Sequence, residues 1–256
     1  MALGGSARPV RIPLEGTGEA DRPDPALGVF STVLVREGVA VDAGAHVARL
    51  QRSAHELYGQ ALPNDLEVRI GAAATAAPLQ RLRVSVTPGP GSLALVELEA
   101  TALDGEPEPQ PALLAPAYLP GGLGPHKWRD RRLLDRLERR LGAHPLIVDH
   151  DDEVLEAATA NVWIVEGATL TTPPLDGRLL AGTVRERMLA VAPTTGLEPR
   201  QTPISLERLR TADEVLLSSA IRGVRPATLT GERSRRFEVG GRLRAALREP
   251  AVAEAR

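Results

Sequence analysis

Apolar and polar positions alternate most clearly between residues 29 and 41, where the chain reads VFSTVLVREGVAV. An alternation with a period of two, interrupted by a Glu-Gly turn, predicts a β-hairpin. Apolar residues then recur at helical spacing between Asp42 and Tyr58, so we expect a helix that Asp42 caps. Residues 81–100 are typical of two strands around a Pro-Gly-Pro-Gly turn. Together these segments predict a small α+β domain.

The pattern changes beyond residues 104–125, a segment whose dense proline and glycine make it the best linker candidate. Short runs typical of strands follow at 145–149, 153–157, 160–166, 168–172, 197–203, 214–219 and 223–230. Helical patterns lie near 129–141, 183–192 and 240–248. Many short strands with few helices favour a barrel-like second domain over a doubly wound sheet. We therefore expect two domains, 1–117 with a loosely held lead-in over 1–27, and 118–256.

Composition and charge narrow the class of protein. The chain has 256 residues, 43% of them apolar, and a net charge of −2, which argues against an overall electrostatic partner such as nucleic acid or an anionic membrane. It has no cysteine and therefore no disulfide or thiolate chemistry. No run has the length of a signal-peptide core or a membrane span, so we expect a cytoplasmic protein.

Two charged segments invite functional interpretations that their patterns do not favour. The run RDRRLLDRLERR (129–140) interleaves acidic with basic residues at helical spacing, which is typical of a solvated helix face rather than a nucleic-acid patch. The five histidines show no metal-ligand spacing, and the acidic residues around His150 indicate a turn. We expect neither a metal nor a nucleic-acid site.

Lys127 is the only lysine, and all the other basic residues among the 31 Lys and Arg are arginines. Codon bias in a GC-rich genome explains the scarcity of lysine, but not why one remains at this position. Arginine replaces lysine readily on a surface, yet it cannot deprotonate and attack a carbonyl. The retained lysine therefore makes Lys127 a candidate nucleophile.

Three further features follow Lys127 in an order that suits one cofactor. Glu156 and Asn161 lie in adjacent predicted strands, and Gly182 directly precedes a predicted helix. Pyridoxal 5′-phosphate requires an amine that holds it as a Schiff base, a carboxylate beside its ring nitrogen, and backbone N–H donors for its phosphate. These residues could supply all three.

The same residues carry a resemblance to a known family. Lys127 followed by a basic helix, Glu156 with Asn161 before Val-Trp, and Thr-Pro-Pro followed by LLAGTVR resemble the fold-type IV, or class IV, pyridoxal phosphate enzymes. Upstream, VFSTVLVREG and the His-x-x-Arg-Leu of residues 46–50 resemble the family's first domain, and residues 212–227 resemble its closing strand. The resemblance covers roughly residues 28–228. It implies a two-domain α+β / α/β fold with a larger barrel-like C-terminal domain.

The resemblance also implies roles for individual residues. Lys127 would form the Schiff base and act as the catalytic acid-base group, Glu156 would contact the pyridinium nitrogen, and Arg49 would bind the phosphate. Other cofactor contacts would come from the helix start and the closing strand, at Gly182, Thr183, Val184, Ser219 and Ala220. Family members pair as homodimers, so we expect a homodimer that acts on a small amino substrate.

Three functions remain open within the family. The favoured one is 4-amino-4-deoxychorismate lyase, a folate-pathway enzyme that releases pyruvate and 4-aminobenzoate, because Arg131 lies four positions after the lysine as in lyase-like members. Branched-chain aminotransferases typically have a tyrosine five positions after the lysine, where this chain has Arg132. The alternatives are a class IV aminotransferase for branched-chain or D-amino acids and 2-oxoglutarate, and a relative without catalysis. The sequence leaves open which of four candidate arginines meets a substrate carboxylate: Arg36, Arg129, Arg131 or Arg222.

Overall fold

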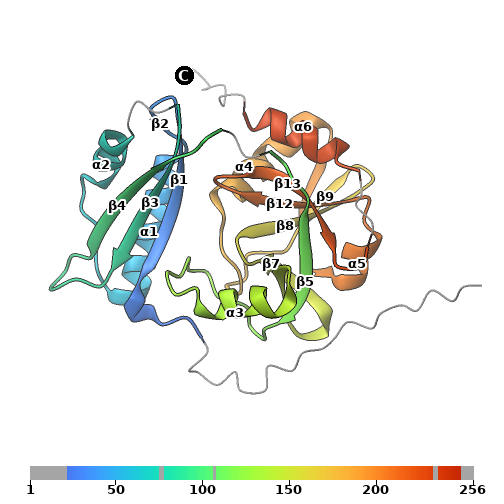
Figure 1. The fold of residues 1–256 in the computed structure, drawn as a ribbon, viewed down its shortest axis with the longest axis horizontal. Coiled ribbons are helices and arrows are strands. Elements are labelled where there is room, and N and C mark those ends of the chain that lie inside the picture. The colour runs from blue at the N-terminus through green and yellow to red at the C-terminus, as the bar shows by residue number, and fades with distance from the viewer. Residues whose placement is uncertain (1–21, 75–77, 106–107, 233–235, 249–256) are drawn as a thin grey trace, which may run out of the picture.

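The computed structural model describes residues 22–74, 78–105, 108–232 and 236–248. These residues form two β-sheets that lie side by side, one from the first part of the chain and one from the rest (Figure 1). The lead-in expected over residues 1–27 falls mostly outside the described residues, and only its end is seen, as a 3-10 turn at Pro25–Leu27.

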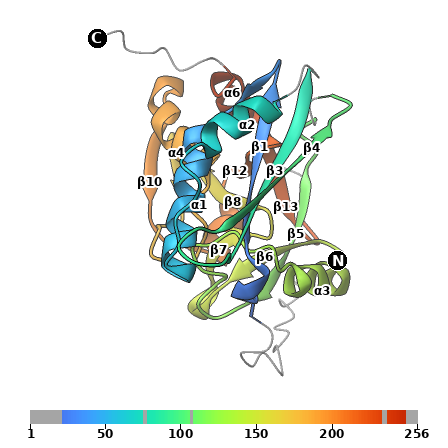
Figure 2. The same ribbon diagram turned by 90° about the vertical axis from the view of Figure 1, so that its left-hand side faces the viewer.

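The first sheet has four strands in the order β2-β1-β3-β4. Its elements are β1 (Val29–Arg36), β2 (Val39–Ala40), β3 (Leu79–Thr87) and β4 (Leu95–Ala102), with helices α1 (Ala43–Tyr58) and α2 (Leu66–Ala73). The two helices pack on this sheet, as Figure 2 shows, and bury apolar side chains such as Leu50 and Ile70 against Val33 and Leu82. The predicted hairpins over 29–41 and 81–100 and the helix to Tyr58 are confirmed, whereas α2 is an addition to the predicted elements.

The predicted cap at Asp42 was wrong. Asp42 has a left-handed backbone with φ of 55°, and its side chain makes no capping bond to the helix. The carboxylate instead accepts a bond from Arg187 at 3.1 Å, in a helix 145 residues further along the chain. A tertiary ion pair therefore replaces the local bond that the sequence indicates.

The second sheet has nine strands in the order β10-β9-β8-β12-β13-β5-β6-β7-β11, and an additional β8–β7 pairing closes six of them into a barrel. The strands are β5 (Ala112–Tyr118), β6 (His144–Val148), β7 (Glu153–Ala157), β8 (Ala160–Glu166), β9 (Thr169–Thr172), β10 (Glu198–Gln201), β11 (Ile204–Ser205), β12 (Glu214–Ser219) and β13 (Gly223–Leu229). The helices are α3 (Arg132–Leu141), α4 (Thr183–Val191), α5 (Leu206–Thr211) and α6 (Glu238–Ala246), with 3-10 turns at His150–Asp152 and Ala192–Thr195. The barrel-like second part expected from the strand pattern is confirmed.

The predicted linker over 104–125 contains a strand that the sequence analysis missed. Strand β5 pairs in parallel with β13 on one side and with β6 on the other, so it is part of the barrel wall. Pro116 within β5 conceals the strand pattern, because proline usually signals a loop. The domain boundary at residue 117 stays a prediction, and the pairing of β5 favours a boundary before Ala112.

The chain that leaves the barrel wall returns to the first sheet just at Lys127. The N–H of Phe30 donates to the carbonyl of Lys127 at 2.8 Å, and the N–H of Arg129 donates to the carbonyl of Gly28 at 3.0 Å. Val29 and Trp128 form an isolated antiparallel bridge between these bonds. The backbone of Lys127 is therefore attached to β1, where the two parts of the molecule meet.

Candidate active site

A cleft of about 560 Å³ opens between the two sheets around Lys127. All eight residues expected to bind the cofactor or act in catalysis line it, although they come from segments up to 171 positions apart: Arg49, Lys127, Glu156, Gly182, Thr183, Val184, Ser219 and Ala220. The fold thus brings the predicted residues into one site. Whether this site suits the cofactor depends on the distances, hydrogen bonds and charges of these residues.

The Lys127 amine is poised to lose its proton near neutral pH. Its Nζ lies 5.0 Å from the centre of the Phe30 ring. Removal from water and repulsion by Arg49 and Arg131 lower the pKa of Lys127 to about 7, against a smaller opposing effect of Glu156. A large share of these amines is therefore neutral and nucleophilic at physiological pH.

Glu156 is a buried carboxylate that accepts one weak hydrogen bond from the described residues. It lies in β7 directly opposite Asn161 of β8, the register that their spacing in the sequence indicates. One Glu156 oxygen accepts the Leu180 N–H at 3.3 Å. Burial raises the pKa of Glu156 to about 7. Such a carboxylate would bind a protonated ring nitrogen favourably, because a cationic donor would offset its desolvation.

Arg49 reaches across the molecule from α1 to the loop that precedes α4. Its guanidinium donates to the carbonyl of Ala181 at 3.2 Å and to Oγ of Ser31 at 2.7 Å. Ser31 Oγ in turn lies 2.7 Å from Nδ1 of His46, whose Nε2 lies 3.4 Å from Oγ1 of Thr183. Ser31 accepts from Arg49, which can only donate, and the direction of its second bond, to His46, follows the His46 tautomer. Burial, aided by Arg49, lowers the pKa of His46 to about 3, so its ring is neutral.

The His46 tautomer sets the direction of its bond to the Thr183 hydroxyl. A neutral His46 that accepts at Nδ1 carries its proton on Nε2 and donates to Thr183. The Thr183 hydroxyl then keeps its own proton for a ligand at the start of α4. Together with Arg49, it would offer donors to an anionic group at this position.

Gly182 leaves room that a side chain would fill. A Cβ at this position would lie 2.1 Å from Oδ1 of Asn161. The Asn161 amide donates to the carbonyl of Leu180 at 2.8 Å and so holds the loop against β8. The φ of Gly182 is −76°, which any residue adopts, so glycine is required here for space and not for backbone conformation.

The Gly182→Ala variant is expected to fold but to bind its cofactor about ten- to a hundred-fold more weakly. The new methyl group must displace Asn161 and the loop before α4, and overpacking of this kind costs about 1–3 kcal/mol. Titration of the cofactor-free variant with pyridoxal 5′-phosphate measures the effect. Gly71→Ala is the matched control, because nothing lies within 4 Å of its added methyl group in α2. Equal affinities in the two variants would contradict a close fit at Gly182.

The donors and acceptors of the cleft fit pyridoxal 5′-phosphate. The Nε atom of Arg49 is buried without a hydrogen-bond partner beside the start of α4, where a phosphate could accept its bond. Glu156 lacks a cation at hydrogen-bond distance in the part of the chain that the structure describes. An anionic group at one end and a protonated ring nitrogen near Glu156 would satisfy both, with Lys127 available to attach the cofactor.

Arginines also line the cleft, including several that the sequence pattern did not identify. Of the four candidates for the substrate-carboxylate partner, Arg131 and Arg222 line the cleft. Arg36 lines a smaller neighbouring pocket, and Arg129 lies 3.9 Å from Glu97. The arginines that were missed are Arg81, Arg83 and Arg225. Alternation along β3 could have identified Arg81 and Arg83 as a pair on one strand face.

The remaining expectations concern metals and membranes. Within the described ranges, no group of three or more His, Asp or Glu side chains is arranged to hold a metal ion. No described helix has the length and apolar character needed to span a membrane. Helix α3 buries Leu133, Leu134 and Leu137 and exposes its charged residues, as its pattern indicates.

Comparison with known proteins gives one family and several related structures. Residues 28–229 match the model of the amino-transferase class IV family. An aminotransferase from Brucella abortus, bound to the cofactor PLP, is 26% identical with a TM-score of 0.72, and the match covers 86% of this chain and 88% of that one. A provisionally named 4-amino-4-deoxychorismate lyase from Legionella pneumophila is 19% identical with a TM-score of 0.72, over 87% and 90% of the two chains.

Curated relatives match over shorter segments. The D-alanine aminotransferase of Listeria monocytogenes is 30% identical over 82 residues, which is 32% of this chain and 28% of that protein. The matches to the first of these relatives span 21% to 31% of their lengths. They are named as branched-chain or D-alanine aminotransferases.

Proposed function

We propose, from the premise that the chain belongs to the amino-transferase class IV family, that it is a 4-amino-4-deoxychorismate lyase dependent on pyridoxal 5′-phosphate. The reaction releases pyruvate and 4-aminobenzoate from a substrate with one amine and two carboxylates. The matched family supports an enzyme of this cofactor class, and the fit of Arg49, Glu156 and Lys127 supports the cofactor. The cytoplasmic location and the homodimer expected from the sequence stay predictions.

The observation that carries the choice of the lyase is the orientation of two neighbouring arginines. Arg131 lines the cleft, and its guanidinium is held by the carbonyl of Ala158 at 3.0 Å. Arg132, where branched-chain aminotransferases typically have a tyrosine, is exposed and pairs with Asp130 at 2.6 Å. This segment therefore supplies the cleft with Arg131, which can bind a carboxylate, and not with the tyrosine that is typical of branched-chain aminotransferases. Arg83, which lies 4.1 Å over the Phe30 ring beside Lys127, offers a second guanidinium for a second carboxylate.

The residues of the cleft would divide the work as follows. When bound, the cofactor withdraws electrons from the substrate carbon that carries the amine. The neutral amine of Lys127 would take the proton from that carbon, and the electron pair left behind would break the bond between the neighbouring ring carbon and the oxygen of the three-carbon fragment. The same group would then return a proton to the methylene carbon of the fragment, which leaves as pyruvate. Arg131 and Arg83 orient the carboxylates, while Arg49 and the start of α4 hold the phosphate. Glu156 keeps a proton on the ring nitrogen.

An aminotransferase is the second candidate, and the names of the curated relatives favour it. In that reaction Lys127 would move a proton away from the substrate carbon that carries the amine. A keto acid would afterwards accept the amino group. A dicarboxylate such as 2-oxoglutarate could use the same two arginines. The lyase requires no amine acceptor, and this difference separates the two functions.

The purified protein loaded with cofactor is expected to convert 4-amino-4-deoxychorismate to equal amounts of 4-aminobenzoate and pyruvate without any keto acid. The two products are measured by fluorescence and by a coupled lactate dehydrogenase assay. Glutamate formation from an amino acid and 2-oxoglutarate, without 4-aminobenzoate, would establish the aminotransferase instead. The absence of both activities in protein that binds the cofactor would favour a non-catalytic relative.

The Arg131→Gln variant tests in the same assay whether Arg131 binds the substrate. Loss of a hydrogen bond to a charged group costs about 1.5–3 kcal/mol, so kcat/KM should fall by about ten- to a hundred-fold. Arg139→Gln, an exposed change in the helix that directly follows Arg131, should leave kcat/KM unchanged. Equal activities of the two variants would mean that Arg131 does not contact the substrate.

A further inference from the structure

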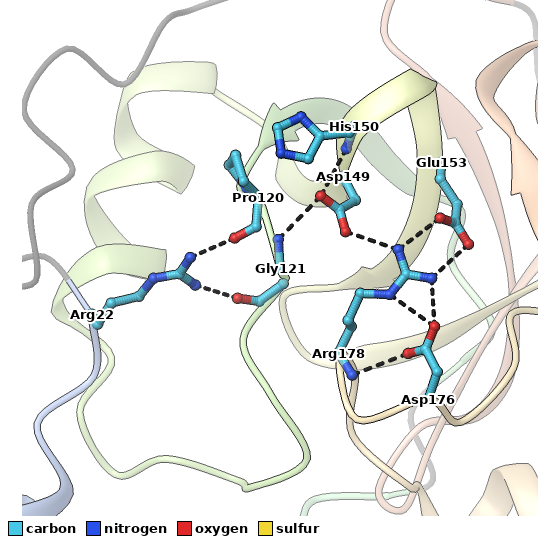
Figure 3. Close-up of polar contacts among 9 residues, drawn as sticks. Arg22, Pro120, Gly121, Asp149, His150, Glu153, Asp176 and Arg178 are labelled. Carbon is cyan, nitrogen blue, oxygen red and sulfur yellow. Dashed lines mark hydrogen bonds and ion pairs between the residues drawn. The ribbon is translucent and has the colours of Figure 1, made fainter.

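A half-buried ion-pair network is centred on Arg178, outside the residues that line the candidate active site (Figure 3). The Arg178 guanidinium donates to Asp149 at 2.8 Å, to both oxygens of Glu153 at 2.6 and 2.8 Å, and to Asp176 at 2.5 and 2.8 Å. One guanidinium thus holds three carboxylates. Asp149 and Glu153 flank the turn between β6 and β7, and Asp176 lies beside Arg178 in the loop after β9, so Arg178 ties this loop to the β6–β7 turn.

The network also holds the glycine-rich loop that precedes Lys127. The other oxygen of Asp149 accepts the N–H of Gly121 at 3.1 Å. A Cβ on Gly122 would lie 2.1 Å from the backbone carbonyl of Arg178, so the two backbones are in close contact. Arg22 adds bonds to two carbonyls of the same loop, as Figure 3 shows. The loop therefore rests on the Arg178 segment through its backbone.

Each of the tied segments leads within a few residues to one cofactor contact. The glycine-rich loop continues to Lys127, strand β7 continues from Glu153 to Glu156, and the Arg178 segment continues to Gly182. We propose that Arg178 is a positioning residue that sets the lysine, the carboxylate and the phosphate-binding turn at the distances the cofactor requires. It would act through the backbone, because its side chain is not among the residues that line the cleft.

The charge balance of the network explains why one arginine has this role. Hydrogen bonds to Glu153, Asp176 and Asp149 raise the pKa of Arg178, and the bond from Arg178 lowers the pKa of Asp176. Without the guanidinium, three carboxylates would remain close together and repel one another. Lysine could replace the charge but not the planar fork that binds several carboxylates at once. The segments would then move apart, and the three cofactor contacts that they carry, Lys127, Glu156 and Gly182, would move apart with them.

The inference concerns the binding of the cofactor and is independent of whether the bound enzyme is a lyase or an aminotransferase. A failed lyase assay would leave it untouched. Conversely, an unperturbed cofactor site in Arg178 variants would overturn it without affecting the proposed reaction.

The test compares Arg178→Gln and Arg178→Lys with Arg208→Gln, each as the full chain. Arg208 is the matched control because it pairs with Glu166 at 2.6 Å and bonds a backbone carbonyl, yet does not line the cleft. Two quantities are measured: the dissociation constant of pyridoxal 5′-phosphate, and the apparent pKa of its absorbance band once bound. Hydrogen exchange at Gly121 and Leu180 in the cofactor-free protein measures how firmly the glycine-rich loop and the Arg178 segment are held.

We expect Arg178→Gln to weaken cofactor binding at least tenfold and to shift the apparent pKa of the band. Exchange at Gly121 and Leu180 should accelerate by a similar factor. Arg178→Lys should fall between Arg178→Gln and the wild type, and Arg208→Gln should match the wild type. If Arg178→Gln fails to fold, Arg178→Lys decides the question. Wild-type affinity and band pKa in a folded Arg178 variant would overturn the proposal, as would equal losses in Arg208→Gln.

Discussion

Replacing Lys127 with alanine is expected to abolish turnover, with a fall in kcat of about 10⁴-fold or more, the upper range for a positioned acid-base group. No second lysine exists in the chain to take its place. The environment of Lys127 lowers its pKa to about 7, so the wild-type amine is neutral often enough to react near physiological pH. Lys127→Arg should be equally inactive, because a guanidinium stays protonated. Steady-state assays and the absorbance of the cofactor band measure both effects.

Lys127→Ala should still bind the cofactor, because Arg49, Glu156 and the start of α4 remain. The bound form should show the spectrum of the free aldehyde in place of the band of the attached cofactor. Arg200→Gln, an exposed change at a residue paired with Glu198, is the control and should retain full activity. A Lys127→Ala protein with more than a hundredth of wild-type kcat would contradict the role of Lys127.

Replacing Glu156 with glutamine is expected to lower kcat by about 10²–10³-fold, in the range measured when one electrostatic contact to a developing charge is removed. A neutral amide cannot keep the proton on the ring nitrogen, so electron withdrawal weakens while Lys127 and Arg49 still hold the cofactor. Cofactor affinity should therefore change much less than kcat. Glu156→Asp, which keeps the charge on a shorter side chain, should retain more activity than Glu156→Gln. Equal kcat values for Glu156→Gln and the wild type would contradict this role.

The raised pKa of Glu156 gives a second, cofactor-free measurement of the same residue. The folded protein holds a proton on Glu156 up to about pH 7, whereas the unfolded chain loses it near pH 4.5. Stability should therefore fall as pH rises from 4.5 to 7, and this loss should be absent in Glu156→Gln. Denaturant unfolding of the cofactor-free proteins at several pH values tests the sign. A wild type that gains more stability than Glu156→Gln over this window would contradict it.

The local sequence pattern predicted correctly the features that depend only on residues nearby in the chain. The Glu156–Asn161 pairing followed from a hairpin register, and the Gly182 turn followed from a helix start. Strand β5 was missed because Pro116 obscures its pattern and because its partners lie about 30 and 115 residues away. Asp42 was misassigned because a long-range bond to Arg187 replaces a local cap.

The parts of the site that sequence could not supply depend on contacts between distant segments. The path from Arg49 through Ser31 and His46 to Thr183 joins β1, α1 and α4, and no spacing in the chain indicates it. The Arg178 network likewise joins its own loop to the β6–β7 turn and, through Asp149, to the glycine-rich loop before Lys127, segments that only the closed barrel brings together. In both cases a pattern identified individual residues, and the fold determined which of them act together.

Reduction of the cofactor-loaded protein with borohydride, followed by peptide mass spectrometry, identifies the amine that holds the cofactor. Reduction makes the covalent linkage permanent, and with one lysine in the chain the remaining primary amine is that of the N-terminus. We expect one cofactor per chain, located on the peptide that contains Lys127. A label on the N-terminal amine, or no label in protein saturated with pyridoxal 5′-phosphate, would contradict it.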